Sequence, residues 1–371
     1  MIVPLLDLKQ QNSVLANELR AVFDRVLMSG MFILGPEVEA LENECAALLG
    51  VRHAIGVSSG TDAILLALMT LRIGLGDEVV CPSFTFFATA GCVARSGATP
   101  VFCDSSGADF NASAADMESR ITPGTRALMP VHLFGQPAGM DEIMELARRR
   151  NLYVIEDAAQ ALGASFGRRK AGTIGTFGTY SFFPSKNLGG FGEGGLLVTD
   201  DDALAEKARV LRGHGAKERY FHTEVGGNFR IDALRAALLR VKLPYLNEYS
   251  ARRRENARYY TERLSDISHI SLPVSVSGRD HIWNQFTMRI HDGRRDALRE
   301  FLRKREIGCE IYYPLPLHLQ ECFANIAESP AVLPKAELLS REVLSIPIFP
   351  ELTRTQQDLV IEVIRSFFIR D

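Results

Sequence analysis

The chain has 371 residues, of which 46% are hydrophobic and 23% are charged, and its 42 Lys and Arg against 45 Asp and Glu give a formal net charge of −3. This composition is typical of a packed globular protein of about two domains, and it excludes a disordered chain, a collagen-like repeat and a coiled-coil rod. The small net charge argues against a protein that binds nucleic acid by neutralising phosphates in bulk.

Membrane, secreted and metal-binding proteins are also disfavoured. The longest apolar stretch, Ala63–Leu71, is much shorter than the roughly 20 residues that a spanning helix needs. Pro4 and Asp7 interrupt an N-terminus that has no basic leader, so no signal peptide is expected. The six cysteines are widely separated and contain no C-x-x-C pair, which indicates reduced thiols in a cytoplasmic protein and no metal site.

Between about residues 50 and 245, short β-branched runs alternate with longer helical patterns. The expected strands are His53–Val57, Glu78–Cys81, Pro100–Cys103, Ala127–Val131, Tyr153–Ile155 and Gly195–Val198. Apolar residues recur at steps of three and four in the expected helices, which are Thr61–Arg72, Thr85–Ser96, Asp116–Ile121 and Met140–Arg150. This alternation predicts an α/β fold, with a mostly parallel sheet covered by helices on both faces and a ligand at the carboxyl ends of the strands.

From about Leu243 the pattern becomes that of a smaller α+β domain. The expected elements are a long polar helix over Pro244–Leu264, a β-rich segment over Gln285–Ile290, a helix over Arg294–Glu306, a strand over Cys309–Tyr313 and a closing helix over Thr355–Phe368. We therefore divide the chain into an N-terminal arm (1–12), a large domain (13–245) and a small C-terminal domain (246–371). We expect the arm to pack on the small domain or on another subunit, and Pro314–Pro334 to be a loop.

A turn of small residues, Ser58-Ser59-Gly60-Thr61-Asp62-Ala63, follows the first strand and opens a helix. The first N–H groups of a helix have no internal partner and the helix dipole favours an anion there, so phosphate is the expected guest. An ordinary helix cap by Ser59 or Thr61 would give the same pattern.

A second motif, Tyr153–Gln160, brings Glu156 and Asp157 to the end of an apolar strand. Carboxylates are rarely buried without a partner, so a carboxylate here must be exposed or must meet a cation or a ring N–H. Alternatively, Asp157 caps the next helix.

The densest motif, Tyr180–Gly190, places Lys186 after an aromatic strand and a proline turn. Burial there would lower the pKa of the lysine and supply the neutral amine that Schiff-base chemistry requires. Gly190, Gly192 and Gly195 match G-x-G-x-x-G, but they lead into an expected strand instead of a helix, so we reject a dinucleotide site. A fourth motif, Gly226–Asp232, is a turn followed by polar residues that fit an anion site or a plain loop.

In this order, the four motifs resemble those of the DegT/StrS-type nucleotide-sugar aminotransferases, which are pyridoxal-phosphate enzymes of the aspartate-aminotransferase fold (fold type I). The resemblance extends over nearly the whole chain, from Asp7 to His318. It implies that Lys186 forms the internal aldimine and moves the proton. It also implies that Asp157 pairs with the pyridine N–H and keeps the ring able to accept electrons.

The resemblance also assigns the other contacts. The further cofactor residues would be Gly60, Thr61, Phe86, Gln160, Ser181 and Asn228. Among them, Gln160 would bind the phenolic oxygen and Phe86 would stack on the ring, with Phe84 as the competing candidate. The other four would bind the phosphate, with Asn228 supplied by a neighbouring subunit of a homodimer that shares its active sites. The implied substrate contacts are Phe32, Arg230, Tyr313 and His318.

The implied reaction is transfer of an amino group from L-glutamate to a keto group of a nucleotide-linked sugar. The run Asn228-Phe229-Arg230-Ile231-Asp232 is more similar to N-S-R-L-D of members that act at C3 than to N-Y-R of members that act at C4, although Phe229 matches neither. UDP and dTDP both fit, and surface glycans, lipopolysaccharide or secondary metabolites could receive the product. The alternatives are a 4-keto sugar, a non-sugar ring ketone and, remotely, a non-catalytic regulatory protein. Relatives that dehydrate sugars carry histidine where this chain has Lys186.

Overall fold

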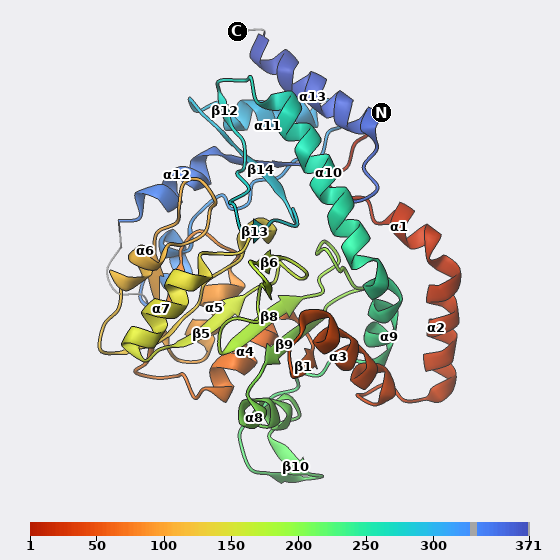
Figure 1. The fold of residues 1–371 in the computed structure, drawn as a ribbon, viewed down its shortest axis with the longest axis vertical. Helices are drawn as coiled ribbons and strands as arrows, with labels where there is room; N and C mark the ends of the chain where they lie inside the picture. The colour runs from red at the N-terminus through yellow and green to blue at the C-terminus, as the bar shows by residue number, and fades with distance from the viewer. Residues whose placement is uncertain (327–331, 370–371) are drawn as a thin grey trace.

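A seven-stranded sheet forms the centre of the structure, a computed structural model that describes residues 1–326 and 332–369. Its strand order is β1-β9-β8-β5-β4-β2-β3 (Figure 1). The strands are β1 (His53–Val57), β2 (Glu78–Pro82), β3 (Thr99–Cys103), β4 (Thr125–Leu128), β5 (Tyr153–Asp157), β8 (Phe177–Ser181) and β9 (Gly195–Thr199). The pairings from β8 to β3 are parallel and β9 is antiparallel to both of its neighbours, which confirms the mostly parallel sheet.

Helices cover both faces of this sheet, as β1 illustrates. Ile55 and Val57 pack in one apolar cluster with side chains of α4 (Gly60–Thr70), whereas Ala54 packs in another with side chains of α3 (Pro36–Leu49). Successive side chains of a strand point to opposite faces, so α3 and α4 lie on opposite sides of the sheet. The other helices of this part are α5 (Ala88–Arg95), α6 (Ala114–Glu118), α7 (Met140–Arg150), α8 (Asp202–Arg212) and α9 (Ala233–Lys242).

Short polar side chains fix where several of these helices begin. Ser59, Ser113, Asp201 and Asp232 are the N-caps of α4, α6, α8 and α9, and each side chain accepts a hydrogen bond from the backbone N–H three residues later. Replacing such a cap by alanine typically costs about 1 kcal/mol of stability. Of these caps, Ser59 lies directly after β1, at the carboxyl edge of the parallel strands.

A second, three-stranded sheet contains only late segments of the chain. Its order is β12-β14-β15, formed by β12 (Ile270–Ser271), β14 (Phe286–Ile290) and β15 (Val343–Ile346). The helices around it are α10 (Leu246–Leu264), α11 (Arg295–Arg303), α12 (Pro334–Glu342) and α13 (Arg354–Ile369). This arrangement supports the division near residue 245, which we retain as a proposal.

The expected strand over Cys309–Tyr313 is wrong. Glu310 forms one isolated bridge with Ser345, and the chain then leaves the sheet toward the cavity described below. The neighbour of β14 is instead β15, which the sequence analysis missed because Val343–Ile346 is an apolar run without a clear period. Within the expected loop Pro314–Pro334, two short 3₁₀ turns occur at Leu317–Leu319 and Glu321–Phe323, and residues 327–331 lie outside the described part.

The first residues pack on the late part of the chain, as expected. Val3 bridges Ile307 in parallel, and Gln11 of α1 (Lys9–Val14) donates a hydrogen bond to Glu351 at 3.2 Å. The two termini therefore lie at the same end of the molecule (Figure 1). The remaining elements are α2 (Ala16–Ser29), the sheet of β6 (Ser165–Phe166), β7 (Arg169–Lys170) and β13 (Arg279–Asp280), and the hairpin of β10 (Ala216–Glu218) and β11 (Phe221–His222).

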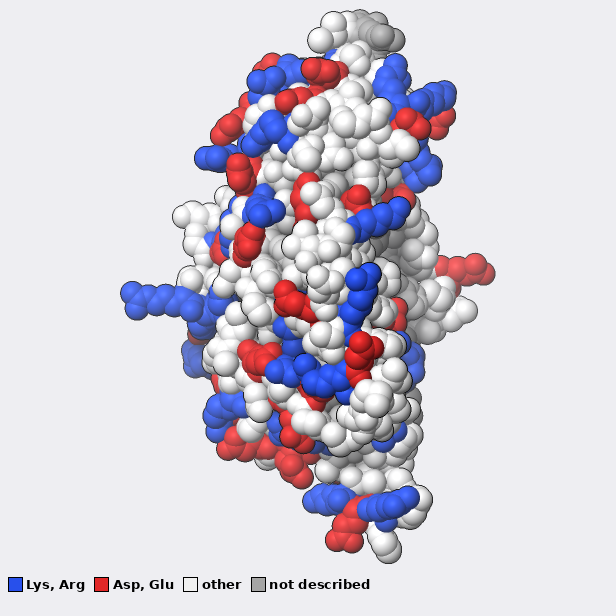
Figure 2. Space-filling view, turned by 90° about the vertical axis from the view of Figure 1, so that its right-hand side faces the viewer, with Lys and Arg blue, Asp and Glu red and all other residues white. Residues whose placement is uncertain are grey.

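Charged side chains of both signs are interspersed on the face shown in Figure 2. Many charged side chains of the molecule form ion pairs, such as Arg240 with Glu37 and Glu44. This face therefore presents no large field of one sign to a polyanion. Within the described residues, no helix combines the length and the apolar character needed to cross a membrane.

Candidate active site

A cavity of about 470 Å³ lies where β5 and β8 end and α4 begins. Eight of the residues singled out from the sequence line it: Gly60, Thr61, Phe86, Asp157, Gln160, Ser181, Lys186 and Tyr313. They come from segments that are far apart in the sequence and meet because parallel strands bring their carboxyl ends to one edge of a sheet.

Lys186 reaches this cavity from the loop that follows β8. Its backbone N–H donates to the Phe183 carbonyl at 2.8 Å, which closes a turn after the strand. The side chain keeps some exposed surface because it faces the cavity, but protein surrounds it. This removal from water lowers the pKa of Lys186 to about 8, against the opposing effect of the Asp157 charge. Near neutral pH a useful fraction of the amine is therefore unprotonated and nucleophilic.

The two carboxylates at the end of β5 have separate partners. Asp157 lines the cavity, and its oxygens accept hydrogen bonds from the Thr89 hydroxyl at 2.8 Å and from the Ala159 N–H at 3.2 Å. The next element along the chain is β6, so Asp157 does not cap a helix. Glu156 is fully buried and accepts hydrogen bonds from His132 and from backbone N–H groups of the loop before β8. Asp157 is therefore the carboxylate available to a ligand.

The start of α4 offers the expected anion site. Ser59 caps the helix, so the N–H groups of Gly60 and Thr61 belong to its first turn, where helices lack internal acceptors. A Cβ at Gly60 would lie 2.8 Å from the Cβ of Ser181, so only glycine allows the helix to approach the end of β8 this closely. The Ser181 hydroxyl accepts from the Phe183 N–H at 3.2 Å and keeps its own hydrogen for a ligand.

The two aromatic candidates occupy different environments. Phe84 is fully buried and packs 6.4 Å from the ring of Phe110, whereas Phe86 is 54% exposed and lines the cavity. Phe86 is therefore the ring available for stacking. Tyr313 lies 6.2 Å from it, centroid to centroid, and burial raises the pKa of the Tyr313 phenol, which stays protonated. Gln160 donates to the Tyr313 hydroxyl at 3.2 Å.

Four predicted residues do not line the cavity, as far as the described residues define its walls: Phe32, Asn228, Arg230 and His318. Three of them form an outer group. Arg230 donates to the exposed Asn228 side chain at 3.0 Å, and the Ile33–Asp232 bridge brings the Phe32 segment beside them. His318 lies elsewhere, with its side chain 2% exposed and its Nδ1 hydrogen-bonded to the Ser83 hydroxyl at 2.6 Å. Its position agrees with a packed histidine.

Several lining residues escaped the sequence analysis. Among them are Thr85, Glu193, Asn284 and Gln285. Glu193 could have been found, because a carboxylate within a glycine-rich turn just after Lys186 is unusual. Asn284 and Gln285 carry no local signal, since only the long-range fold brings them to the cavity.

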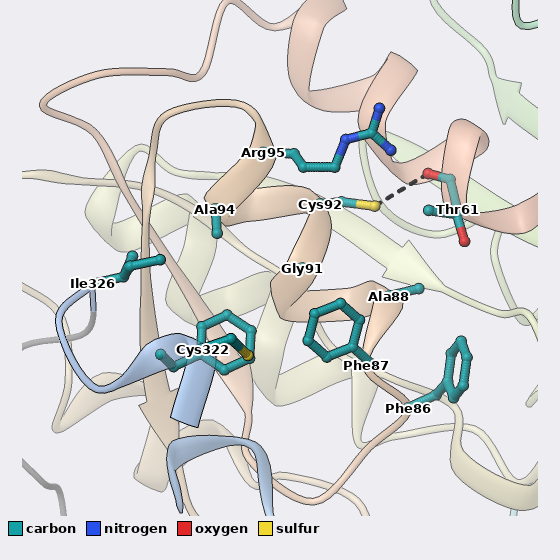
Figure 3. Close-up of a pocket in the computed structure, with 11 residues that line it drawn as sticks. Thr61, Phe86, Phe87, Ala88, Gly91, Cys92, Ala94, Arg95, Cys322 and Ile326 are labelled. Atoms are coloured by element: carbon teal, nitrogen blue, oxygen red, sulfur yellow. Dashed lines mark hydrogen bonds between the residues drawn. The ribbon is translucent and has the colours of Figure 1, made fainter. Parts of the chain in front are cut away.

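A second hollow of about 450 Å³ adjoins the first and shares Thr61, Phe86 and Ala88 with it (Figure 3). Its walls are mostly apolar, and Phe87 packs 5.6 Å from the ring of Phe323. Figure 3 shows Cys92 beside Thr61, where its thiol donates to the Thr61 carbonyl at 3.2 Å. The cavity around Lys186 therefore opens beside an apolar surface.

The donor set of the Lys186 cavity fits pyridoxal phosphate. The first turn of α4 and Ser181 match a phosphate, Asp157 matches a pyridinium N–H, and Lys186 offers the amine that condenses with an aldehyde. The volume is also that of an ordinary cofactor site.

Comparison with known proteins agrees with this fit. The model of the DegT/DnrJ/EryC1/StrS aminotransferase family matches residues 14–365. A protein named pleiotropic regulatory protein from Geobacillus stearothermophilus is 46% identical, with 99% of each chain covered. A dTDP-3-amino-3,4,6-trideoxy-alpha-D-glucose transaminase from Streptomyces venezuelae is 44% identical over 98% of this chain and 96% of its own. A UDP-N-acetyl-3-dehydro-alpha-D-glucosamine 3-aminotransferase from Acidithiobacillus ferrooxidans is 44% identical over 98% and 97%.

Among solved structures, that of S. venezuelae DesV in complex with a ketimine intermediate matches with a TM-score of 0.96 and 44% identity, over 100% of this chain and 99% of that one. The predicted fold type, the aminotransferase class and pyridoxal phosphate as cofactor are thereby confirmed. The chain belongs to the DegT/DnrJ/EryC1/StrS aminotransferase family.

Proposed function

We propose that this enzyme transfers an amino group from L-glutamate to the C3 keto group of a hexose linked to UDP or dTDP. The observation that carries the proposal is the cavity in which Lys186, its pKa lowered to about 8, and Asp157 come together beside the anion site of α4. Such a set binds the cofactor and moves protons in one enclosure.

The residues would act in sequence as follows. Pyridoxal phosphate, when bound, supplies an electron sink for the carbon that loses its proton. The N–H groups of Gly60 and Thr61 would hold its phosphate, and the carboxylate of Asp157 would accept a hydrogen bond from its ring N–H. Once free, the Lys186 amine takes a proton from the donor amino acid at one carbon and returns it at another. Phe86 and Tyr313 enclose the reacting atoms and limit access of water.

The choice of C3 is supported by the names of the relatives, and the packing of Phe229 explains why this residue departs from both patterns. Two of the relatives described above are named as 3-amino or 3-keto sugar transaminases, with dTDP and UDP as their nucleotides. Phe229, the departure from both N-x-R patterns, packs against an apolar cluster, and a Cβ at Gly227 would lie 2.4 Å from its ring. Its side chain therefore shapes the loop and leaves Asn228 and Arg230 to meet the substrate or the cofactor phosphate.

We further propose a homodimer in which Asn228 of one chain serves the cavity of the other. Asn228 is exposed and absent from the described lining of its own chain's cavity, which is what this arrangement requires. Phe86 and Phe87, 54% and 49% exposed, lie beside the apolar hollow and offer surface for a second copy (Figure 3). All six cysteines are unpaired, which favours the cytoplasm as the site of action.

The visible spectrum of the purified enzyme tests this proposal. With pyridoxal phosphate added, we expect a yellow absorption band that bleaches on addition of L-glutamate and returns on addition of a UDP- or dTDP-linked 3-keto hexose. Bleaching by another donor would replace L-glutamate, and recovery with a 4-keto sugar or a ring ketone alone would replace the C3 assignment. Absence of the band would overturn the role of Lys186.

A further inference from the structure

A second buried lysine, Lys242, contacts the loop that carries Lys186. It is the last residue of α9, it is 2% exposed, and its ammonium group donates to the Gly189 carbonyl at 2.6 Å. The same nitrogen lies 5.5 Å from the ring centroid of Phe191. A buried ammonium group is costly unless it is hydrogen-bonded, so the contact with Gly189 is a strong constraint on both partners.

The Lys186 loop, residues 182–190, is closed by a backbone hydrogen bond between its ends. A displacement of Gly189 therefore changes the conformation of the rest of the loop. The Gly190 N–H donates to the Phe182 carbonyl at 2.7 Å, which joins the two ends of the segment. A Cβ at Gly189 would lie 2.1 Å from the Pro184 carbonyl oxygen, so the backbone at Gly189 packs directly on Pro184, two residues before Lys186. Displacing Gly189 therefore displaces Pro184 and the turn that begins there.

The opposite side of the loop is held separately. Asn187 donates to the Ile282 carbonyl at 3.0 Å, and Asn284 donates to the Asn187 side chain at 3.0 Å. These amides fix the loop to the segment before β14, whereas Lys242 fixes it to α9. The loop that carries the Lys186 amine is thus held by hydrogen bonds on two sides, and the one from Lys242 is the hydrogen bond with a charged donor.

The reacting nitrogen needs such control. It must reach the cofactor carbonyl, leave it, and move a proton between two carbons, so a displacement of about 1 Å is enough to cost roughly 100-fold in rate. We propose that Lys242 is a positioning residue that sets the location of the Lys186 amine through its hydrogen bond to the Gly189 carbonyl. This inference rests on the proposed role of Lys186.

Lys207 provides a matched control. Its ammonium group also donates to a backbone carbonyl, that of Thr70 at 2.7 Å, and burial lowers the pKa of both lysines. Thr70 lies at the end of α4 remote from Gly60, so this contact stabilises a helix end without touching the Lys186 loop. K242M and K207M therefore remove the same kind of hydrogen bond in two places.

Two measurements separate positioning from plain stability. Hydrogen exchange of the full-length protein without cofactor measures how fast the backbone N–H groups of residues 186–190 exchange with solvent. Steady-state kinetics of the cofactor-loaded enzyme give kcat and KM. We expect K242M to speed exchange in this loop and to lower kcat by about 10- to 100-fold with little change in the KM for the amino donor. K207M should lower the melting temperature without altering either readout.

Equal loop exchange and equal kcat in K242M and K207M would overturn the inference. If K242M does not fold, K242Q replaces it, because the glutamine side chain keeps a polar group but is about one bond too short to reach the Gly189 carbonyl. Faster exchange of the loop amides in K242Q supports the inference, and unchanged exchange refutes it. The exchange measurement does not depend on turnover. A wild-type protein without amino transfer would therefore refute the proposed function, while the exchange comparison would still decide whether Lys242 holds the loop.

Discussion

Two regions of the molecule contrast: the cavity around Lys186, here called the inner region, and the outer group of Phe32, Asn228 and Arg230, here called the outer region. They differ in how many of the expected ligand contacts a single chain brings together. The groups for covalent and charge chemistry, Lys186 and Asp157, lie in a single enclosure, and the hydrogen-bond partners of Asp157 are in place. Asn228 and Arg230 instead bind each other at 3.0 Å, outside the described lining of that enclosure. The groups suited to the chemistry thus gather at one sheet edge, whereas the residues implied in recognition lie on loops outside the described lining of the cavity.

The strongest way to test the inner region is to remove its amine. K186A should abolish the yellow band and lower amino transfer by about 100- to 10,000-fold, because no other lysine lines the described cavity to act as the base. The spectrum and the rate of keto-sugar amination are measured together, with the melting temperature as the check on folding. A folded K186A enzyme with wild-type turnover would exclude Lys186 from the mechanism.

The next largest effect is expected at Asp157. D157N keeps the shape but removes the charge that, by the proposed role, would meet the ring N–H. Hydrogen bonds to charged groups are worth about 1.5–3 kcal/mol, or roughly 10- to 150-fold in rate. Single-turnover bleaching by L-glutamate measures the loss. T89V is the companion variant, since it removes the hydroxyl that holds Asp157 but leaves the charge, and its loss should be smaller. A D157N enzyme as fast as wild type would contradict the assignment.

The outer region is tested by mixing two inactive chains. If Asn228 serves the partner's cavity, a K186A chain paired with an N228A chain forms one site with both defects and one intact site. Activity should then return when the two variants are refolded or co-expressed together, although each alone is impaired. Should Asn228 act within its own chain, no site is intact and mixing restores nothing. Size-exclusion chromatography of the mixture confirms that hybrid dimers form.

The pH dependence of cofactor loading is expected to show a smaller effect, but it tests the pKa of Lys186 directly. Only the neutral amine of Lys186 attacks the aldehyde, so the loading rate should rise about tenfold per pH unit and level off above about pH 8, instead of near the ordinary lysine value of 10.5. Because the Asp157 charge raises the pKa of Lys186, D157N should move the plateau to lower pH. A plateau that moves upward would contradict the electrostatic coupling of the two groups.

The sequence predicted the inner region well because its signals are local. Lys186 and Asp157 each follow an apolar strand, and strand ends gather at one edge of a parallel sheet, so their meeting follows from pattern alone. Thr89 was missed because its partner is 68 residues away and nothing near it marks the contact. The strand expected over Cys309–Tyr313 failed for the opposite reason: a short apolar run fits a strand or a cavity wall, and the tertiary structure uses Tyr312 and Tyr313 for the wall.

The smallest effect is expected at His318, which belongs to neither the cavity lining nor the outer group. Its side chain is buried on Ser83, so H318A should lower the free energy of unfolding by about 1 kcal/mol while leaving the KM for the keto sugar little changed. Burial lowers the pKa of His318, so the unfolded chain binds its proton more readily and the wild-type protein should lose stability as the pH falls below about 6.5. H318A should lose less over the same interval, as urea unfolding at pH 7 and pH 5.5 would measure. A large rise in KM without loss of stability would instead move His318 into the group of residues that recognise the sugar.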